Sequence, residues 1–203
     1  MKIEVQKPNI IRIAFHQTKD DPHYGSCLWA YFDFDLDTYM LNIQSDAEDG
    51  HYRWCETPET EDFLHLMARI WDDYLIHKLY HDRQEVDVEA TLAEVRDYLG
   101  IGEDDWRDDD LTEDEIEERE GAMSDLRGLF EENENMTQET AVNILESWNE
   151  DHEEFELCDI WERVCMDFTA GQKRVVQIFK DYVQPKIREM IREGAKDGPE
   201  NKD

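Results

Sequence analysis

The sequence predicts an α+β fold in which an antiparallel β-meander with covering helices carries an acidic helical arm. Residues 1–56 alternate with the period of strands, and later segments repeat apolar residues at helical spacing. Within the helical part, the run Glu103–Glu120 holds twelve acidic residues against two arginines. We expect four parts: a sheet with two covering helices over 1–100, an acidic helical insertion over 101–150, a late strand and C-terminal helix returning to the core over 151–193, and a disordered tail over 194–203.

Three stretches near the N-terminus place apolar side chains on one face of a sheet. These positions alternate with others that include Arg12, Asp33 and Asn42. Turn-forming sequences rich in Asp, Pro and Gly separate the stretches, and Tyr52–Cys55 closes the set. The pattern predicts an antiparallel meander with the inward residues Ile11, Ile13, Phe15, Leu28, Ala30, Phe32, Phe34, Tyr39, Leu41 and Ile43.

Two helices are expected to follow the strands. Thr57-Pro58-Glu59 predicts a helix start, with a capping hydroxyl, a proline at the first helical position and an acid in the first turn. A second helix is expected from about Val88 to Leu99, ended by Gly100. The first helix has an apolar stripe that can cover the sheet, formed by Phe63, Met67, Ile70, Trp71, Tyr74 and Leu75.

The acidic run itself is expected to be largely helical. Thr112 and Glu115 match a capping box, which predicts a helix beginning after Thr112. A further helix is expected over about 137–148. The apolar seam of the acidic helix is narrow, and it consists of Ile116, Met123, Leu126, Leu129 and Phe130.

The last part of the chain predicts a return to the sheet. Residues 161–168 alternate and favour a late strand, with a helix as the alternative. Thr169 and Gln172 match a second capping box, and the apolar helix that follows should kink or break at Pro185. Between residues 173 and 192 six bases oppose two acids, so we expect this helix to dock on acidic neighbours.

The overall charge limits the functions that the chain can have. Its 53 acids and 21 bases give a formal net charge of −32, which disfavours direct binding to nucleic acid or to an anionic membrane. The 22 aromatic residues distinguish it from a disordered acidic tail. The start lacks the apolar core of a signal peptide, and the four cysteines follow no zinc spacing. We expect a cytoplasmic protein with reduced thiols and no cofactor.

One group of residues suggests a metal site. Asp73, His77 and His81 recur every four residues on the first long helix, so their side chains project from one face. Two imidazoles and a carboxylate suit zinc or another divalent metal, which would indicate a metal-dependent enzyme. The general-base glutamate of His-Glu-x-x-His is missing, however, and the alternative is a solvated helix edge. No nucleophile elbow, P-loop or dinucleotide-binding turn occurs in the chain.

The acidic surface suggests a different function. Neighbouring acids on a helix lie about 5–6 Å apart, and DNA presents one negative charge per ~1.7 Å of its axis. A rigid acidic face can therefore imitate a duplex and pair with the Lys and Arg groups of a nucleic-acid-binding protein. The alternative interpretation is a solvated helix face whose charge serves only solubility.

Three stretches resemble small acidic proteins encoded by bacterial prophages. They are Tyr24-Gly-Ser-Cys-Leu-Trp-Ala30, Thr57-Pro-Glu-Thr-Glu-Asp-Phe-Leu-His-Leu-Met-Ala-Arg69 and Met166-Asp-Phe-Thr-Ala-Gly-Gln-Lys173. Such proteins are similar in character to anti-CRISPR proteins, several of which imitate DNA to block a CRISPR nuclease. The resemblance implies a phage inhibitor in the host bacterial cytoplasm whose partner is a CRISPR effector nuclease. It assigns no role to any single residue.

These observations lead to one main hypothesis and two alternatives. The main hypothesis is an acidic DNA mimic that occupies the basic channel of a host defence nuclease, with Trp106 as an anchor on an apolar or cationic spot of the partner. The alternatives are the metal-dependent enzyme and a phage accessory protein whose acidity is only solubilising. The apolar C-terminal helix is a candidate surface for a homodimer. The expected phosphate surrogates are Asp104, Asp105, Asp108, Asp109, Asp110, Glu113, Glu117, Glu118 and Glu120.

Overall fold

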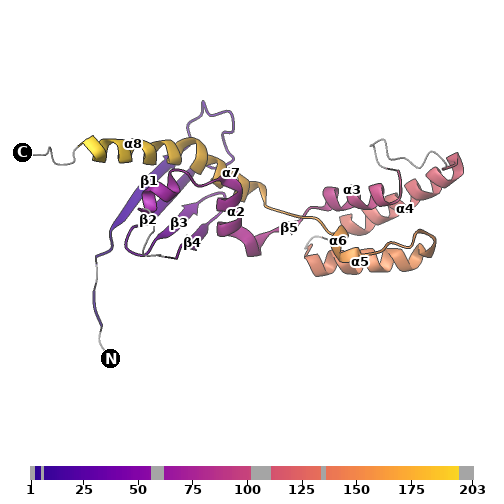
Figure 1. The fold of residues 1–203 in the computed structure, drawn as a ribbon. Coiled ribbons are helices and arrows are strands. Elements are labelled where there is room, and N and C mark those ends of the chain that lie inside the picture. The colour runs from indigo at the N-terminus through magenta and orange to yellow at the C-terminus, as the bar shows by residue number, and fades with distance from the viewer. Residues whose placement is uncertain (1–2, 6, 56–61, 102–110, 134–135, 197–203) are drawn as a thin grey trace, which may run out of the picture. The chain divides into compact units, whose positions relative to one another are not determined.

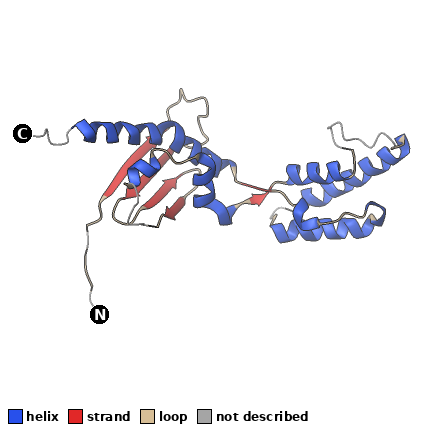
Figure 2. Cartoon of the chain, viewed as in Figure 1, coloured by secondary structure: helices blue, strands red, loops and turns tan. Residues whose placement is uncertain are grey.

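The chain folds into two compact units. The computed structural model describes residues 3–5, 7–55, 62–101, 111–133 and 136–196. Unit 1 comprises residues 1–83 and 168–203, and unit 2 comprises residues 84–167. Unit 1 contains a four-stranded sheet with helices, and unit 2 is mostly helical, so the fold is α+β as predicted (Figure 2). Because unit 2 separates two segments of unit 1 along the chain, it is an insertion into unit 1.

The sheet of unit 1 is an antiparallel meander with the strand order β1-β2-β3-β4 (Figure 1). Its strands are β1 (Ile10–His16), β2 (Trp29–Asp35), β3 (Met40–Ser45) and β4 (Gly50–Arg53). The predicted alternation is confirmed, because Phe15, Ala30, Phe32, Phe34, Leu41 and Ile43 are all buried. Leu28 departs from this alternation, because it precedes β2 and the residue is 44% exposed.

Helices cover the apolar face of the sheet (Figure 1). The segment expected to form one helix is divided in two, and the capping carboxylate of Asp62 accepts a hydrogen bond from the Leu64 N–H at 2.9 Å. The predicted start at Thr57 lies outside the described residues. Trp71 and Tyr74 were expected to face inward, but Trp71 precedes the second helix and both side chains are exposed. The two helices are α1 (Phe63–Met67) and α2 (Asp72–Tyr80), and the 3-10 turn η1 (His81–Arg83) follows α2.

The C-terminal helices return to the sheet and complete this core. They are α7 (Ala170–Ile178), the π-helical turn η3 (Phe179–Val183) and α8 (Gln184–Lys196). Pro185 was expected to kink or break the helix, yet helical structure continues through it. The Gln184 N–H bonds to the carbonyl of Phe179, five residues earlier, so the wider turn accommodates a proline that cannot donate.

Unit 2 forms a separate helical core. Its main helices are α3 (Val88–Tyr98), α4 (Glu113–Glu131) and α5 (Gln138–Asp151), with the 3-10 turn η2 (Glu153–Phe155) and the short helix α6 (Ile160–Arg163). Trp148 lies in the centre, and its indole N–H donates to the carbonyl of Ala122 at 2.9 Å. The buried residues around it include Leu92, Val95, Leu126, Phe130, Ala141 and Leu145.

Two predictions about this part of the chain need correction. Helix α3 forms where expected, but it packs against α4 in unit 2 instead of covering the sheet. The predicted strand over 161–168 is reduced to β6 (Met166–Asp167), which pairs with β5 (Glu85–Val86) and not with the sheet. In both cases the apolar pattern indicates a buried face without indicating which surface covers it.

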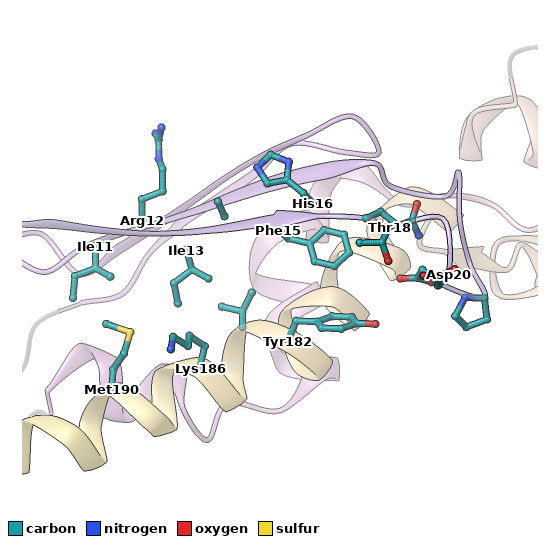
Figure 3. Close-up of a pocket in the computed structure, with 15 residues that line it drawn as sticks. Ile11, Arg12, Ile13, Phe15, His16, Thr18, Asp20, Tyr182, Lys186 and Met190 are labelled. Carbon is teal, nitrogen blue, oxygen red and sulfur yellow. The ribbon is translucent and has the colours of Figure 1, made fainter.

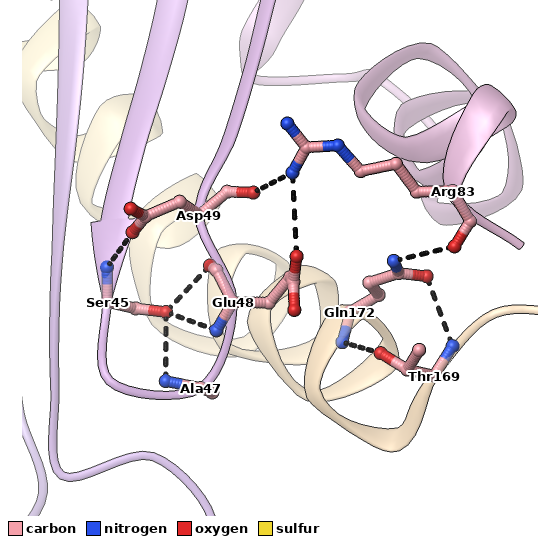
Figure 4. A network of polar contacts seen from close by, with 7 residues as sticks. All are labelled: Ser45, Ala47, Glu48, Asp49, Arg83, Thr169 and Gln172. Carbon is pink, nitrogen blue, oxygen red and sulfur yellow. Dashed lines mark hydrogen bonds and ion pairs between the residues drawn. The ribbon is translucent and has the colours of Figure 1, made fainter. Parts of the chain in front are cut away.

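A polar network within unit 1 holds together the two points at which the chain leaves for unit 2 and returns (Figure 4). The buried side chain of Gln172 donates to the carbonyl of Arg83 at 3.0 Å. The predicted capping box is confirmed, with Gln172 and Thr169 joined by two bonds of 3.1 Å. The guanidinium of Arg83 donates to the Asp49 carbonyl at 3.0 Å and contacts Glu48 at 3.5 Å.

Candidate functional site

The formal charge of the chain is concentrated in unit 2. This unit contains 31 acidic residues, five arginines and no lysine, which gives a formal net charge of −26. Unit 1 contains 22 acidic residues and 16 lysines and arginines, for a net charge of −6. The acidity is therefore mainly a property of one helical unit.

Each arginine that the structure describes in unit 2 forms an ion pair or a hydrogen bond with another residue of the same unit. Arg127 forms a bidentate pair with Glu89, with nitrogen–oxygen distances of 2.6 and 3.0 Å. The hydrogen bond from Arg127 holds the pKa of the Glu89 carboxyl below its ordinary value. The other contacts join Arg163 to Glu94, Arg96 to Glu120, and Arg119 to the carbonyl oxygen of Leu99.

Helix α4 carries the densest described row of carboxylates. Its start is fixed by the predicted capping box, in which the Thr112 hydroxyl accepts from the Glu115 N–H and the Glu115 carboxylate accepts from the Thr112 N–H. These bonds from Thr112 lower the pKa of Glu115. The buried residues Ala122, Met123, Leu126 and Phe130 face the core, which orients the acids outward. The exposed acids of α4 are Glu113, Asp114, Glu115, Glu117, Glu118, Asp125 and Glu131.

The predicted phosphate surrogates have different positions. Glu113, Glu117 and Glu118 are exposed on α4. Glu120 is half-buried, and its carboxylate is paired with Arg96, so it is less available to a partner than predicted. Five surrogates and the proposed anchor lie outside the described residues: Asp104, Asp105, Asp108, Asp109, Asp110 and Trp106.

A second acidic row was missed by the sequence reasoning. Helix α5 buries Ala141, Val142, Leu145 and Trp148 and turns its other side outward. A count of acids against bases between 84 and 167, in place of the single run Glu103–Glu120, would have found this row. Its exposed carboxylates are Glu139, Glu146, Glu150 and Asp151.

A groove with a volume of about 650 Å³ lies between α3 and α4. The Arg127–Glu89 and Arg96–Glu120 pairs both line it. Its remaining lining includes Leu92 and Met123, with Ser124 as the only hydroxyl. The groove offers alternating charges, and the rest of the described helical surface offers carboxylates that can neutralise cationic side chains.

The structure does not assemble the predicted metal ligands. The Nδ1 atom of His77 lies 2.6 Å from the Asp73 carbonyl oxygen, and its ring packs edge-on against Phe168 at 4.9 Å. His81 is exposed in the 3-10 turn after α2. Among the described residues no three His, Cys, Asp or Glu side chains form a group that could hold a metal ion.

Comparison with known protein families shows a similarity to a phage family. A protein-family model described as a phage family, Phage_phiTE_072, matches residues 1–191. No curated protein and no solved structure is similar to the chain at a significant level. The helices of the described residues include none that is both long and apolar enough to cross a membrane.

Proposed function

Because the chain belongs to this phage family, we propose that it is a phage-encoded inhibitor that uses unit 2 as an acidic mimic of DNA. The target is a basic nucleic-acid-binding protein of the host. In its most specific form the target is a defence nuclease of the CRISPR effector class, whose DNA channel the acidic unit occupies. Lys and Arg side chains that normally neutralise phosphates then pair with Asp and Glu.

The division of charge between the two units carries this proposal. An acidity that served only solubility has no reason to gather in one unit, because both units face water. Instead, unit 2 holds a net charge of −26 and unit 1 holds −6. Concentrated charge destabilises the unit that contains it, through self-repulsion. A function that requires a compact acidic body accounts for that cost.

The charge density of α4 supports imitation of a duplex. Residues 113–118 include five acids, and six helical residues rise by about 9 Å at ~1.5 Å each. The acids therefore follow one another at about 1.8 Å of axis, close to the ~1.7 Å per charge of double-stranded DNA. Their backbone is held by the capping box and by the buried seam of α4, so they are presented on a rigid element.

A gel-shift assay with a CRISPR nuclease–guide complex on its target DNA tests the proposal. We expect the wild-type protein to abolish the shifted band at low salt and to lose this effect as salt rises, because exposed charges are screened. The variant Glu113→Lys/Asp114→Lys/Glu117→Lys/Glu118→Lys should inhibit at least about tenfold more weakly, a loss of ~1.4 kcal/mol or more.

A matched variant controls for the loss of negative charge alone. Asp73→Lys, Asp82→Lys, Asp181→Lys and Glu193→Lys reverse four exposed acids of unit 1 and change the net charge by the same amount. This control should inhibit like the wild type. Equal inhibition by both variants would reject unit 2 as the inhibitory surface. An unchanged band at saturating wild-type protein would reject mimicry for that nuclease.

A further inference from the structure

Strand β1 is an unprotected edge of the sheet. Among the described residues it pairs only with β2, in a register that runs without interruption from Ile10 opposite Asp35 to His16 opposite Trp29. Edge strands of soluble proteins are usually shortened, bulged or interrupted by proline, because their free backbone groups pair readily with another strand. β1 has seven residues, no proline and no bulge. Its one charged residue, Arg12, is bound to Asp33 by two bonds of 2.6 Å.

The free backbone groups belong to the even-numbered residues of β1. The Leu36 N–H donates to the Asn9 carbonyl and the Gln17 N–H donates to the Leu28 carbonyl, both at 2.9 Å. Odd-numbered residues therefore hold the ladder to β2. Since alternate residues of an antiparallel strand turn their N–H and C=O to opposite sides, residues 10, 12, 14 and 16 direct theirs to the open edge.

A groove with a volume of about 810 Å³ runs along this edge. Figure 3 shows Ile11, Ile13 and Phe15 pointing from β1 towards the helix, while Arg12 and His16 point to the other side of the strand. Three side chains from successive helical turns line the opposite wall, and they are Tyr182, Lys186 and Met190. A free backbone edge beside an apolar wall accepts an extended chain segment by strand addition.

The chain itself carries a segment with the matching pattern. Ile3 and Val5 are 80% and 98% exposed, although both side chains are large and apolar. Both residues have odd numbers, as the inward residues of β1 do. Because side chains of an extended chain alternate between two faces, an extended arm presents both on the same face. The arm cannot easily reach the groove of its own copy, because Asn9 remains in the ladder with its N–H bound to Asp37 at 2.9 Å. Figure 1 shows the described residues before β1 leading away from the sheet.

We propose that the β1 groove binds the N-terminal arm of a second copy of this chain, and that the two copies exchange arms. In an antiparallel register, Ile3 of one copy lies opposite Phe15 of the other and Val5 lies opposite Ile13. Pro8, which has no N–H to donate, lies opposite Ile10 beside the twofold axis, so the backbone bonds at Arg12 and Ala14 carry the ladder. Both arm side chains then face the wall formed by Tyr182, Lys186 and Met190. In this register Asn9 of one copy faces Asn9 of the other, so a twofold axis passes between them. Each arm then occupies the groove of the other copy, and the dimer is closed. The proposed surface includes only part of the C-terminal helix predicted from sequence, namely Tyr182 and Met190, because Val175, Val176, Phe179, Val183 and Ile187 are buried.

Sedimentation velocity of the full chain across a range of concentrations tests the dimer, at moderate salt because the net charge opposes association. We expect the wild type to reach twice the monomer mass and Ile3→Asp/Val5→Asp to remain monomeric. Ala14→Pro should also be monomeric, because it removes an N–H at the open edge and leaves the ladder to β2 intact. The control Leu129→Asp changes an exposed apolar residue of unit 2 and should dimerise normally.

A cross-link tests the register directly. In a background that carries Cys55→Ser, Cys158→Ser and Cys165→Ser, Glu4→Cys/Ala14→Cys places two thiols opposite each other across the proposed interface, within disulfide reach. Mild oxidation should give a covalent dimer, whereas Glu4→Cys/Gln44→Cys, with the second thiol on β3, should not. A wild type that stays monomeric at high concentration overturns the proposal. A dimer that persists in Ile3→Asp/Val5→Asp also overturns it, and this test does not depend on whether Ala14→Pro folds.

Discussion

The side-chain amide of Gln172 donates a 3.0 Å hydrogen bond to the backbone carbonyl of Arg83, 89 residues earlier in the chain. Arg83 is the last residue of unit 1 before the insertion, and Gln172 lies in the first turn of the helix after it. The same Gln172 side chain completes the capping box with Thr169. One buried residue, Gln172, therefore links the two segments of unit 1 that lie before and after the insertion.

Replacing this residue tests how far the junction stabilises unit 1. Gln172→Ala should lower the free energy of unfolding of unit 1 by about 1–3 kcal/mol, because a carbonyl and a helix N-terminus lose their partners. The effect is measured by hydrogen exchange of the full-length protein at increasing denaturant, with exchange read separately from peptides of unit 1 and of unit 2. The exposed Gln138, also in the first turn of a helix, is the control: Gln138→Ala should change little. A loss of protection confined to unit 2 would contradict this assignment.

The two cores should respond separately to a mutation. Trp148→Phe removes the indole N–H that bonds to the Ala122 carbonyl and leaves a void in the core of unit 2. We expect unit 2 to lose about 2–3 kcal/mol while hydrogen exchange in unit 1 is unchanged. Uniform acceleration of exchange in both units would show that they unfold together, against this expectation.

Salt should stabilise unit 2 more than unit 1. The like charges of unit 2 repel one another, and salt shortens the distance over which they interact, to ~10 Å at 0.1 M. Thermal unfolding followed by unit-specific hydrogen exchange should therefore show a larger rise in the melting temperature of unit 2 with added sodium chloride. Equal shifts in both units, or a larger shift in unit 1, would be inconsistent with the charge distribution.

The thiol of Cys27 should make unit 1 sensitive to alkali. Burial, and a hydrogen bond to Asp46, raise its pKa from 9.0 to about 11. A raised folded-state pKa gives stability that is complete below pH 9 and is lost as the pH rises towards 11, by about 2–3 kcal/mol for a shift of this size. Cys27→Ser should reduce the slope of stability against pH in this window, as measured by denaturant unfolding. An unchanged slope would assign the alkaline loss to other groups, such as the buried Tyr80.

The parts of the fold that could be predicted depend on local signals. Period-two alternation predicted β1, β2 and β3, and the capping boxes at Thr112 and Thr169 marked two helix starts. The partner of α3 could not be predicted, because the stripe of Leu92, Val95 and Leu99 fits any apolar surface. Two independent cores follow from contacts between distant residues, which no local pattern contains.

The sequence predicted the negative charge of the candidate site, but not which of its carboxylates are exposed and which are paired within the unit. The exposed row at Glu113 and Glu117 agrees with the expected helix face. The pairing of Glu120 with Arg96, 24 residues away, depends on how α3 packs against α4 and has no local signal. For the same reason the sequence could not show that the acidic excess is concentrated in one helical unit that includes α5.

The insertion of unit 2 through β5 and β6 has a consequence for how such a protein can change. The first and last strands of the unit pair directly, Glu85 with Asp167 and Val86 with Met166, so its two ends lie side by side. Unit 1 has its own sheet, helices and core, formed by the chain segments before and after the insertion. Residues 84–167 therefore form a segment that could be exchanged as one piece for another helical body, while the sheet scaffold of unit 1 keeps its own core.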